Sequence, residues 1–410
     1  MRVLHVGKFF PPHPGGIERC TADLCAALEQ QQVRTAVLAH AEPGSGTARR
    51  RAAAGFDVTL AACHGQFLYA PVSPAFPRLL RATIRDFQPD LLHLHLPNTS
   101  AFFALIVAAA RRLPWVVHWH ADIPLDTNRR MLRWAYRFYR PWEQAVLRRA
   151  RAIIATSAPY RDSSAALAPW NDKTRVIPLG IAPLSPVATG VDQGRAELAP
   201  GGTGLRVLAV GRLSYFKGID VLLRAIAQLS DASLVVIGDG ECRAALERQA
   251  AELGIGSRVR FAGRVDMDER GEAALAAAYA NADVLCLPST DRAESFGLVL
   301  LEAMRARLPV VASAIPGSGV TFVVRDGETG VLVAPGDAAA LAGALRQLAG
   351  DAALRERLGK AGAQRWRDEF TLDQAAQRVI GLYRSILGPM SPETTADRAT
   401  AMPADSRPPG

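Results

Sequence analysis

The sequence is poor in cysteine and has no long apolar run. Its five cysteines among 410 residues include no CxxC pair, which argues against a disulfide framework and against a thiolate zinc site, and favours buried, reduced thiols. The longest apolar candidate, residues 100–110, is shorter than the roughly 18 residues of a membrane span. Residues 1–10 resemble a strand and lack the features of a signal peptide. We therefore expect a cytoplasmic protein.

Lysine is scarce, and the positive charge is uneven. Only four of the 48 basic residues are lysine. Residues 1–182 hold 23 basic and 12 acidic residues, whereas the remainder holds 25 and 27, so the whole positive excess lies in the first half. The four lysines are Lys8, Lys173, Lys217 and Lys360.

Part of that excess is concentrated in residues 128–151, which contain eight arginines and one acid, Glu143. Aromatic residues alternate with these arginines. A cationic helix of this kind suits the anionic surface of a membrane, at the inner face of the cytoplasmic membrane; a nucleic-acid contact or a merely solvated face are the other interpretations. The arginines assigned to a membrane-facing surface are Arg129, Arg130, Arg133, Arg137 and Arg140.

Strand-like and helix-like segments alternate along the chain, with helical patterns at 16–31, 74–88 and 98–112 in the first half. This alternation predicts an α/β fold with parallel sheets covered by helices on both faces. A stretch rich in Pro, Gly and Ala interrupts it at 183–204. We therefore expect two doubly wound, Rossmann-like domains, residues 1–182 and 205–370, joined by a linker at 183–204.

A last helix, within 371–388, is expected to pack back on the N-terminal domain. The tail, 389–410, is rich in Pro, Ala and Thr and is expected to be disordered. Two such domains would face each other across a cleft, at the carboxyl ends of their strands, where open α/β sheets bind ligands.

The loop that follows the first strand carries two adjacent glycines, Gly15 and Gly16, at the start of a helix. Glycines let a ligand approach the backbone closely, and a helix N-terminus attracts anions such as phosphate. The loop matches neither G-x-G-x-x-G nor G-x-x-x-x-G-K-[ST], which argues against a dinucleotide dehydrogenase and a P-loop NTPase.

A second strand-to-helix turn, residues 207–220, places Arg212 and Lys217 on either side of the start of a helix. Two cations beside a helix N-terminus suit a pyrophosphate, whose negative charge increases as it leaves. An ordinary pair of surface cations is the alternative interpretation.

A third segment, residues 293–313, sets Glu294 and Glu302 eight positions apart. Glu294 falls in a loop after a strand, and the helix is expected to begin near Phe296 or Gly297, with Glu302 in its first two turns. Carboxylates accept hydrogen bonds from the neighbouring hydroxyls of sugars. We assign Glu294 to a transferred sugar and Glu302 to a ribose; local pairing or capping by Glu302 is the alternative.

These segments together resemble the retaining glycosyltransferases of family 4, which have the two-domain GT-B fold. The resemblance is carried by PPHPGGIER (11–19), RVIPLGI (175–181), GRLSYFKG (211–218) and ESFGLVLLE (294–302), and spans nearly the whole chain in the expected order. Residues 116–182 are most similar to members that add mannose or rhamnose during surface-polysaccharide assembly, as in O-antigen or exopolysaccharide.

The resemblance implies a nucleotide-diphosphate sugar as donor and a lipid-linked or oligosaccharide acceptor, with no cofactor. His120 would lie at the edge of the sugar, near the acceptor. The leaving phosphate would help to deprotonate the acceptor hydroxyl, so no side-chain nucleophile is implied. The implied catalytic set is His120, Arg212, Lys217 and Glu294. The implied donor-binding set is Gly15, Gly16, Arg212, Lys217, Arg264, Val265, Glu294, Ser295, Phe296, Gly297, Leu298 and Glu302.

Two pairs of histidines, His93 with His95 and His118 with His120, each lie on one face of a strand, a spacing that can bind metal. Only Asp122 adds a ligand type nearby, so we interpret His120 as a polar site residue and expect no metal. The acidic run DMD, 266–268, precedes a predicted helix and is interpreted as its N-cap. We expect metal-independent transfer and no nucleic-acid partner.

Two alternatives remain open at this level. Another GT-B enzyme, either a sugar-nucleotide epimerase or a transferase that makes a soluble product, would share Arg212, Lys217 and Glu302. A non-catalytic basic protein that binds membranes or nucleic acid would not need them, so their presence argues against it.

Overall fold

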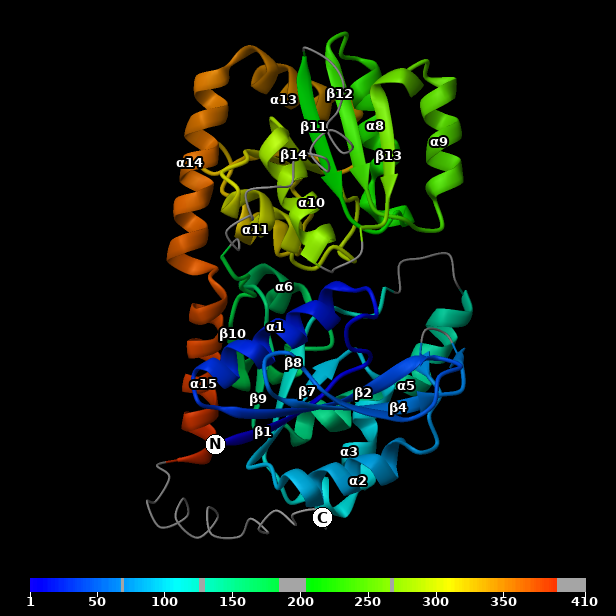
Figure 1. Ribbon diagram of the computed structural model, residues 1–410, viewed down its shortest axis with the longest axis vertical. Helices are drawn as coiled ribbons and strands as arrows, with labels where there is room; N and C mark the ends of the chain where they lie inside the picture. Colours follow the sequence, from blue (N-terminus) through cyan, green and yellow to red (C-terminus); the bar gives the residue numbers. More distant parts are fainter. Residues whose placement is uncertain (68–69, 125–129, 184–203, 266–268, 389–410) are drawn as a thin grey trace, which may run out of the picture.

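The computed structural model describes residues 1–67, 70–124, 130–183, 204–265 and 269–388. The expected linker therefore lies outside the described residues, except for its two end residues. The DMD run and the tail also lie outside them. Figure 1 shows two lobes stacked along the long axis of the molecule. Among the described helices, none is long and apolar enough to cross a membrane.

The first lobe is built on an eight-stranded sheet in the order β10-β9-β8-β7-β1-β2-β4-β3. All neighbours are parallel except β3 and β4. Its strands are β1 (Arg2–Val6), β2 (Arg34–Pro43), β3 (Ala48–Arg51), β4 (Asp57–Cys63), β7 (Leu91–Leu96), β8 (Trp115–Trp119), β9 (Ala152–Ala155) and β10 (Thr174–Val176), with a separate hairpin of β5 (Gln66–Phe67) and β6 (Ala70–Pro71). Its helices are α1 (Gly16–Gln30), α2 (Phe76–Phe87), η1 (Thr99–Phe102), α3 (Phe103–Ile106), α4 (Ala108–Arg111), α5 (Arg130–Arg149), α6 (Ala158–Ser163) and η2 (Ala168–Lys173).

The second lobe is built on a six-stranded parallel sheet in the order β13-β12-β11-β14-β15-β16. Its strands are β11 (Leu205–Val210), β12 (Ala232–Ile237), β13 (Val259–Gly263), β14 (Val284–Leu287), β15 (Val310–Ser313) and β16 (Val331–Val333). Its helices are η3 (Tyr215–Lys217), α8 (Ile219–Ala227), α9 (Arg243–Glu252), η4 (Gly256–Arg258), α10 (Glu269–Asn281), α11 (Leu298–Arg305), α12 (Val320–Val323), α13 (Ala338–Gly350) and α14 (Ala352–Glu369).

The central strands are buried along their whole length, as β7 (LLHLHL) and β12 (ASLVVI) show. Helices on both faces of a parallel sheet exclude water from both sides, so its strands have continuous rather than alternating apolar residues. The prediction of two doubly wound α/β units is confirmed. The expected single helix over 98–112 is wrong, because Val107 adopts an extended conformation (φ −75°, ψ 111°) and separates α3 from α4.

The last helix, α15 (Leu372–Leu387), returns to the first lobe (Figure 1). It begins at a capping box made by Thr371 and Gln374, which satisfies free N–H groups at the helix start. Val379 and Tyr383 are buried there with residues of α1, β1 and β7.

The chain passes between the lobes twice, and the two passages are joined by backbone hydrogen bonds. Ile181 N–H donates to Phe370 O at 3.1 Å, and Leu372 N–H donates to Ile181 O at 3.0 Å. A Cβ at Gly180 would lie 2.4 Å from Thr371 O, so only glycine fits beside the second passage without displacing it. Ile181 and Thr371 thus form a bridge between two distant segments.

Candidate functional site

The N-terminus of α1 faces the N-terminus of α11 across the lobes. A Cβ at Gly16 would lie 3.5 Å from Leu298 Cδ1, so the backbone of Gly16 is close to the helix that carries Glu302. At Gly15 a Cβ would lie 1.9 Å from Glu18 Oε2. Gly16 therefore lets the start of α1 come close to α11, and a side chain at Gly15 would meet Glu18; the role of both glycines in binding an anion stays a prediction.

Lys217 and Glu294 form a direct ion pair, with 2.6 Å between Lys217 Nζ and Glu294 Oε2. Both side chains are largely buried, at 15% and 9% exposure. Ser289 Oγ donates to the same carboxylate oxygen at 2.9 Å, and Ser318 Oγ donates to the backbone carbonyl of Glu294. Charge-assisted bonds of this kind hold both groups in defined positions, so this pair is the fixed centre of the candidate site.

Lys217 and Arg212 line one small pocket at the carboxyl ends of β11 and β14, together with Gly211 and Pro288. Arg212 is far more exposed, at 69%, and its Nη2 lies 3.3 Å from Glu241 Oε2. Burial lowers the pKa of Lys8 in the first lobe, an effect that Glu18 opposes and Arg212 reinforces. Lys8 and Arg212 therefore influence each other, while Arg212 and Lys217 are the cations that line the pocket.

Glu302 is buried, and both carboxylate oxygens have partners. Tyr279 OH donates to Oε2 at 2.7 Å, and Arg19 Nη1 from the first lobe lies 3.3 Å from Oε1. Burial, with a further contribution from Glu302, raises the pKa of Tyr279 well above its usual value, so its hydroxyl remains a donor at neutral pH.

The segment between the two glutamates is shaped by Gly297, which adopts a left-handed conformation (φ 82°) that favours glycine. The helix α11 starts at Leu298, one residue later than expected. Phe296 is buried, and Ser295 O accepts a hydrogen bond from Gly319 N–H at 2.8 Å. Neighbouring residues therefore hold this part of the implied donor-binding set in place.

Arg264 and Val265, which belong to the implied donor-binding set, follow β13. Arg264 is exposed, and Val265 packs at the edge of the core around α11. They lie beyond the turn at Gly263, whose carbonyl accepts from Gly238 N–H at 2.8 Å. No contact in the described residues tests their role, which stays a prediction.

His120 is only 3% exposed and lines a small cavity with Cys20, His95, His118 and Leu179. The two histidine pairs lie on adjacent strands, and His5 joins them from β1. In the described part of the chain, two groups of three close histidines could hold a metal ion, namely His5 with His93 and His95, and His95 with His118 and His120. Sequence spacing alone did not reveal this gathering.

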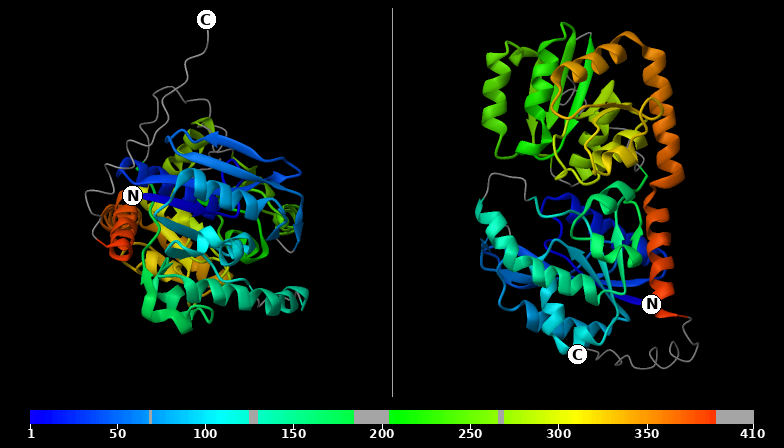
Figure 2. Two further views of the ribbon diagram at one scale, coloured as in Figure 1. Left: turned by 90° about the horizontal axis from the view of Figure 1, so that it is seen from below. Right: turned by 180° about the vertical axis from the view of Figure 1, so that it is seen from behind.

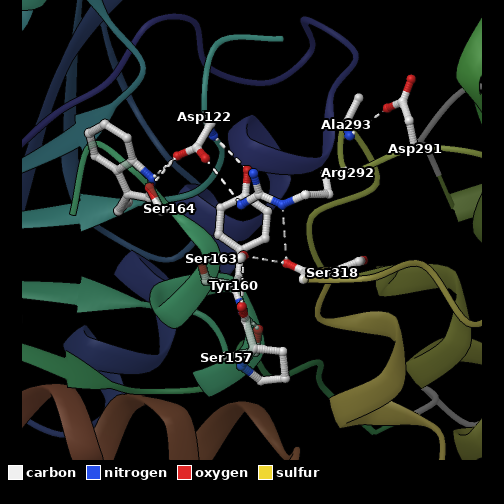
Figure 3. A network of polar contacts seen from close by, with 12 residues as sticks. Asp122, Ser157, Tyr160, Ser163, Ser164, Asp291, Arg292, Ala293 and Ser318 are labelled. Atoms are coloured by element: carbon white, nitrogen blue, oxygen red, sulfur yellow. Dashed lines mark hydrogen bonds and ion pairs between the residues drawn. The ribbon is translucent and has the colours of Figure 1, made fainter. Parts of the chain in front are cut away.

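A polar network connects the lobes beside the site (Figure 3). Arg292 Nη2 lies 3.1 Å from Asp122 Oδ2, and its guanidinium lies 4.7 Å from the centre of the Tyr160 ring. Asp122 Oδ1 also accepts from Ser164 Oγ at 2.6 Å and from the Trp119 indole at 2.9 Å. The network joins the loop after β8 to the loop that precedes Glu294.

Of the arginines assigned to a membrane surface, Arg133, Arg137 and Arg140 are exposed on α5. Arg129 lies outside the described residues, and Arg130 begins α5. The same helix exposes apolar residues at 50–63%. These are Met131, Trp134, Phe138 and Trp142.

Several contacts near the predicted site were not found from the sequence. Ser289 and Tyr279 hold the two glutamates, Arg19 reaches Glu302 from the other lobe, and Asp122 pairs with Arg292. Arg19 completes the PPHPGGIER segment, and Asp122 follows His120 by two residues, so their positions in these segments were the available signals.

Two doubly wound parallel α/β lobes of this kind have the GT-B fold, which is the fold of a class of glycosyltransferases. Comparison with known proteins agrees. Residues 15–180 match the glycosyl transferase 4-like domain, and residues 192–365 match the glycosyl transferases group 1. The chain belongs to this family of retaining enzymes, which transfer a sugar from a nucleotide sugar.

Similar proteins cover nearly the whole chain. It is 31% identical over 384 residues to the D-rhamnosyltransferase WbpZ of Pseudomonas aeruginosa, covering 90% of this chain and 92% of that protein. It is 32% identical over 393 residues to the phosphatidyl-myo-inositol mannosyltransferase of Mycobacterium leprae, covering 94% and 97%. The structure of sucrose-phosphate synthase from Thermosynechococcus elongatus superposes with a TM-score of 0.74 at 25% identity, covering 94% and 99%.

Proposed function

We propose that the protein transfers a hexose of the mannose or rhamnose type to a lipid-linked or oligosaccharide acceptor in surface-polysaccharide assembly. The single observation that carries the site assignment is the buried Lys217–Glu294 pair, 2.6 Å apart, beside the loop that faces α1. Lys217 stabilises the diphosphate as negative charge develops on it, and Glu294 accepts hydrogen bonds from the sugar. The rhamnosyl- and mannosyltransferases among the similar proteins support this choice of sugar.

Within this proposal, the second lobe binds the donor and the first lobe the acceptor. Gly15 and Gly16 present N–H groups to the pyrophosphate, and Arg212 and Lys217 bind it from the other side. Glu302 exchanges Arg19 for the ribose hydroxyls, and His120 contacts the sugar. The remaining members of the donor set are Arg264, Val265, Ser295, Phe296, Gly297 and Leu298. None of these steps uses a metal ion.

We also propose that α5 contacts the inner face of the cytoplasmic membrane. Its four exposed apolar residues follow a spacing of three and four positions, which places them on one face. The neighbouring arginines would bind anionic headgroups. Figure 2 shows α5 on the outer side of the first lobe, away from α15, so a membrane could reach it.

The decisive experiment is a panel of nucleotide sugars, comprising guanosine-diphosphate mannose and rhamnose, thymidine-diphosphate rhamnose and uridine-diphosphate glucose. Thermal stabilisation would identify the donor, and nucleotide release with and without acceptor would identify the reaction. We expect release that depends on acceptor and persists in excess chelator. Epimerisation or hydrolysis without acceptor would favour the other GT-B activities, and abolition by chelator would show that metal is required.

A further inference from the structure

Five histidine side chains gather in the interior of the first lobe. They come from adjacent strands, where the register pairs His5 with His93 and His95 with His118, while His120 directly follows β8. Each is at most 3% exposed, and their rings stack at centroid distances between 4.2 and 5.6 Å. The proposed site residue His120 is thus the end of a larger buried group.

Three of these rings form a chain of hydrogen bonds. His5 Nδ1 lies 3.1 Å from His95 Nε2, and His95 Nδ1 lies 2.9 Å from His120 Nε2. Burial lowers the pKa of each ring far below 6.5, so all three are neutral at pH 7. A neutral imidazole has one donor nitrogen and one acceptor nitrogen, and both bonds must therefore point the same way along the chain.

The contacts of Thr21 indicate in which direction the hydrogen bonds between the histidine rings run. Its hydroxyl donates to Ile17 O at 2.8 Å, and its Oγ1 lies 3.3 Å from His95 Nδ1. A hydroxyl has one hydrogen, and the shorter bond to Ile17 uses it. Thr21 Oγ1 can therefore only accept from His95, which places the proton of His95 on Nδ1, where it is shared between Thr21 Oγ1 at 3.3 Å and His120 Nε2 at 2.9 Å.

The buried end of this hydrogen-bond chain, at His5, indicates the same direction. His5 Nε2 is fully buried and has no hydrogen-bond partner in the described residues. If the bonds ran from His120 towards His5, this nitrogen would carry a proton with no acceptor. A buried N–H without a partner costs about 1–3 kcal/mol, and such groups are rarer than acceptors without a partner. If the bonds run from His5 towards His120, His5 Nε2 carries no proton and is only an acceptor without a partner.

We propose that His95 and Thr21 are positioning residues that hold His120 in the tautomer with its proton on Nδ1. His95 Nδ1–H donates to His120 Nε2, so His120 offers a donor, not an acceptor, at its other nitrogen. That nitrogen has no hydrogen-bond partner in the described part of the chain, and it is not fully buried. This inference rests on the proposed contact of His120 with the sugar, where Nδ1–H would bind a hydroxyl oxygen.

The same histidines could instead hold a metal ion, since two groups of three bring their nitrogens within 4.8 Å of one another. A metal needs an unprotonated nitrogen from every ligand. In the proposed chain, His5 and His95 carry protons on the nitrogens that face the next ring. Binding of metal by these rings and the hydrogen-bond chain are therefore mutually exclusive, and metal content distinguishes them.

The test is NMR of the full chain with 15N-labelled histidine, because protonated and bare ring nitrogens differ in chemical shift. The His120 signals are assigned by their loss in His120→Gln. We expect Nδ1–H at His120 in the unaltered protein and in His95→Asn, whose amide keeps a donor near the position of Nδ1. In His95→Leu an Nε2–H population should emerge. Nε2–H at His120 in the unaltered protein, or about one zinc per chain on these rings, would overturn the proposal.

Measurements of kcat/KM test the proposal independently of the NMR experiment. We expect His95→Leu to lower kcat/KM about fivefold, the effect of one neutral hydrogen bond, and His95→Asn to restore most of it. His118→Leu is the matched control, since His118 stacks on His120 at 4.2 Å without bonding to it. Equal losses in both leucine variants would show a packing effect and contradict the proposal. If no sugar is transferred at all, the proposed function fails, while the tautomer measured by NMR still tests this inference.

Discussion

Arg292 and Asp122 form an ion pair between the two lobes, with 3.1 Å between Nη2 and Oδ2. Arg292 precedes Glu294 by two residues, and Asp122 follows His120 by two. The pair thus ties together one loop from each side of the candidate site (Figure 3). Because Arg292 also lies over Tyr160, its contacts with the first lobe place Glu294 relative to His120.

A double-mutant cycle tests this link. We expect Arg292→Gln and Asp122→Asn each to lower kcat/KM for transfer, and the double variant to lose little more than either. The coupling should be about 1 kcal/mol, or fivefold, as for a partly exposed pair. Additive losses would show that the two residues act separately. Arg325→Gln, which alters an ion pair within the second lobe, serves as the control.

Lys217→Ala should lower kcat about 100-fold while changing donor affinity much less, because its charge matters most as the phosphate leaves. Single-turnover kinetics and donor titration would separate the two effects. Lys360→Ala, at an exposed helical pair, is the matched control. An unchanged turnover number would remove Lys217 from the reaction.

Replacing each of the two glutamates should change the affinity for ligands in a different way. Glu302→Gln should weaken a nucleoside diphosphate and its sugar conjugate alike, by about tenfold, because the ribose is present in both. Glu294→Gln should weaken only the sugar conjugate. Calorimetric titration of both ligands against both variants checks this, and an identical pattern for the two variants would refute the assignment.

Replacing Arg133, Arg137 and Arg140 together with Gln should weaken binding to anionic vesicles by about 100-fold, at about 1 kcal/mol for each arginine. Activity on a soluble acceptor should be unchanged. The control replaces three exposed arginines of the second lobe with Gln. If both triple variants bind vesicles equally, α5 is not the membrane-facing surface. The control residues are Arg248, Arg346 and Arg357.

Glu143, the one acid of residues 128–151, is 1% exposed, and burial raises its pKa to about 7, with Asp122 adding to the effect. Its stabilising contribution is therefore present below about pH 4.5 and lost as the pH rises through 7. We expect Glu143→Gln to be more stable than the unaltered protein at pH 8, by up to about 3 kcal/mol. Urea unfolding at pH 5 and pH 8 measures this, and a difference independent of pH would contradict it.

The alternation of elements was sufficient to predict two parallel sheets, because the carboxyl ends of parallel strands must meet at one edge. The same rule placed Lys217 and Glu294 near each other, since each follows a strand of the second lobe. Motif spacing could not show that Glu302 meets Arg19, because that contact depends on the angle between the lobes.

The hydrogen-bond chain of histidines could not be predicted from the sequence either. Each pair, His93 with His95 and His118 with His120, is visible as an alternation along one strand. That β7 lies between β1 and β8, and therefore brings His5 to the same group, depends on strand order. Strand order is set by packing of the whole sheet, which local patterns do not encode.

The bridge between Ile181 and Thr371 has a mechanical consequence. The two segments are bonded side by side, so a displacement of one is passed to the other. A bulkier residue at Gly180 would meet Thr371 O and push the segments apart. Because both segments connect the same two lobes, a change at this single position would alter how the lobes are joined.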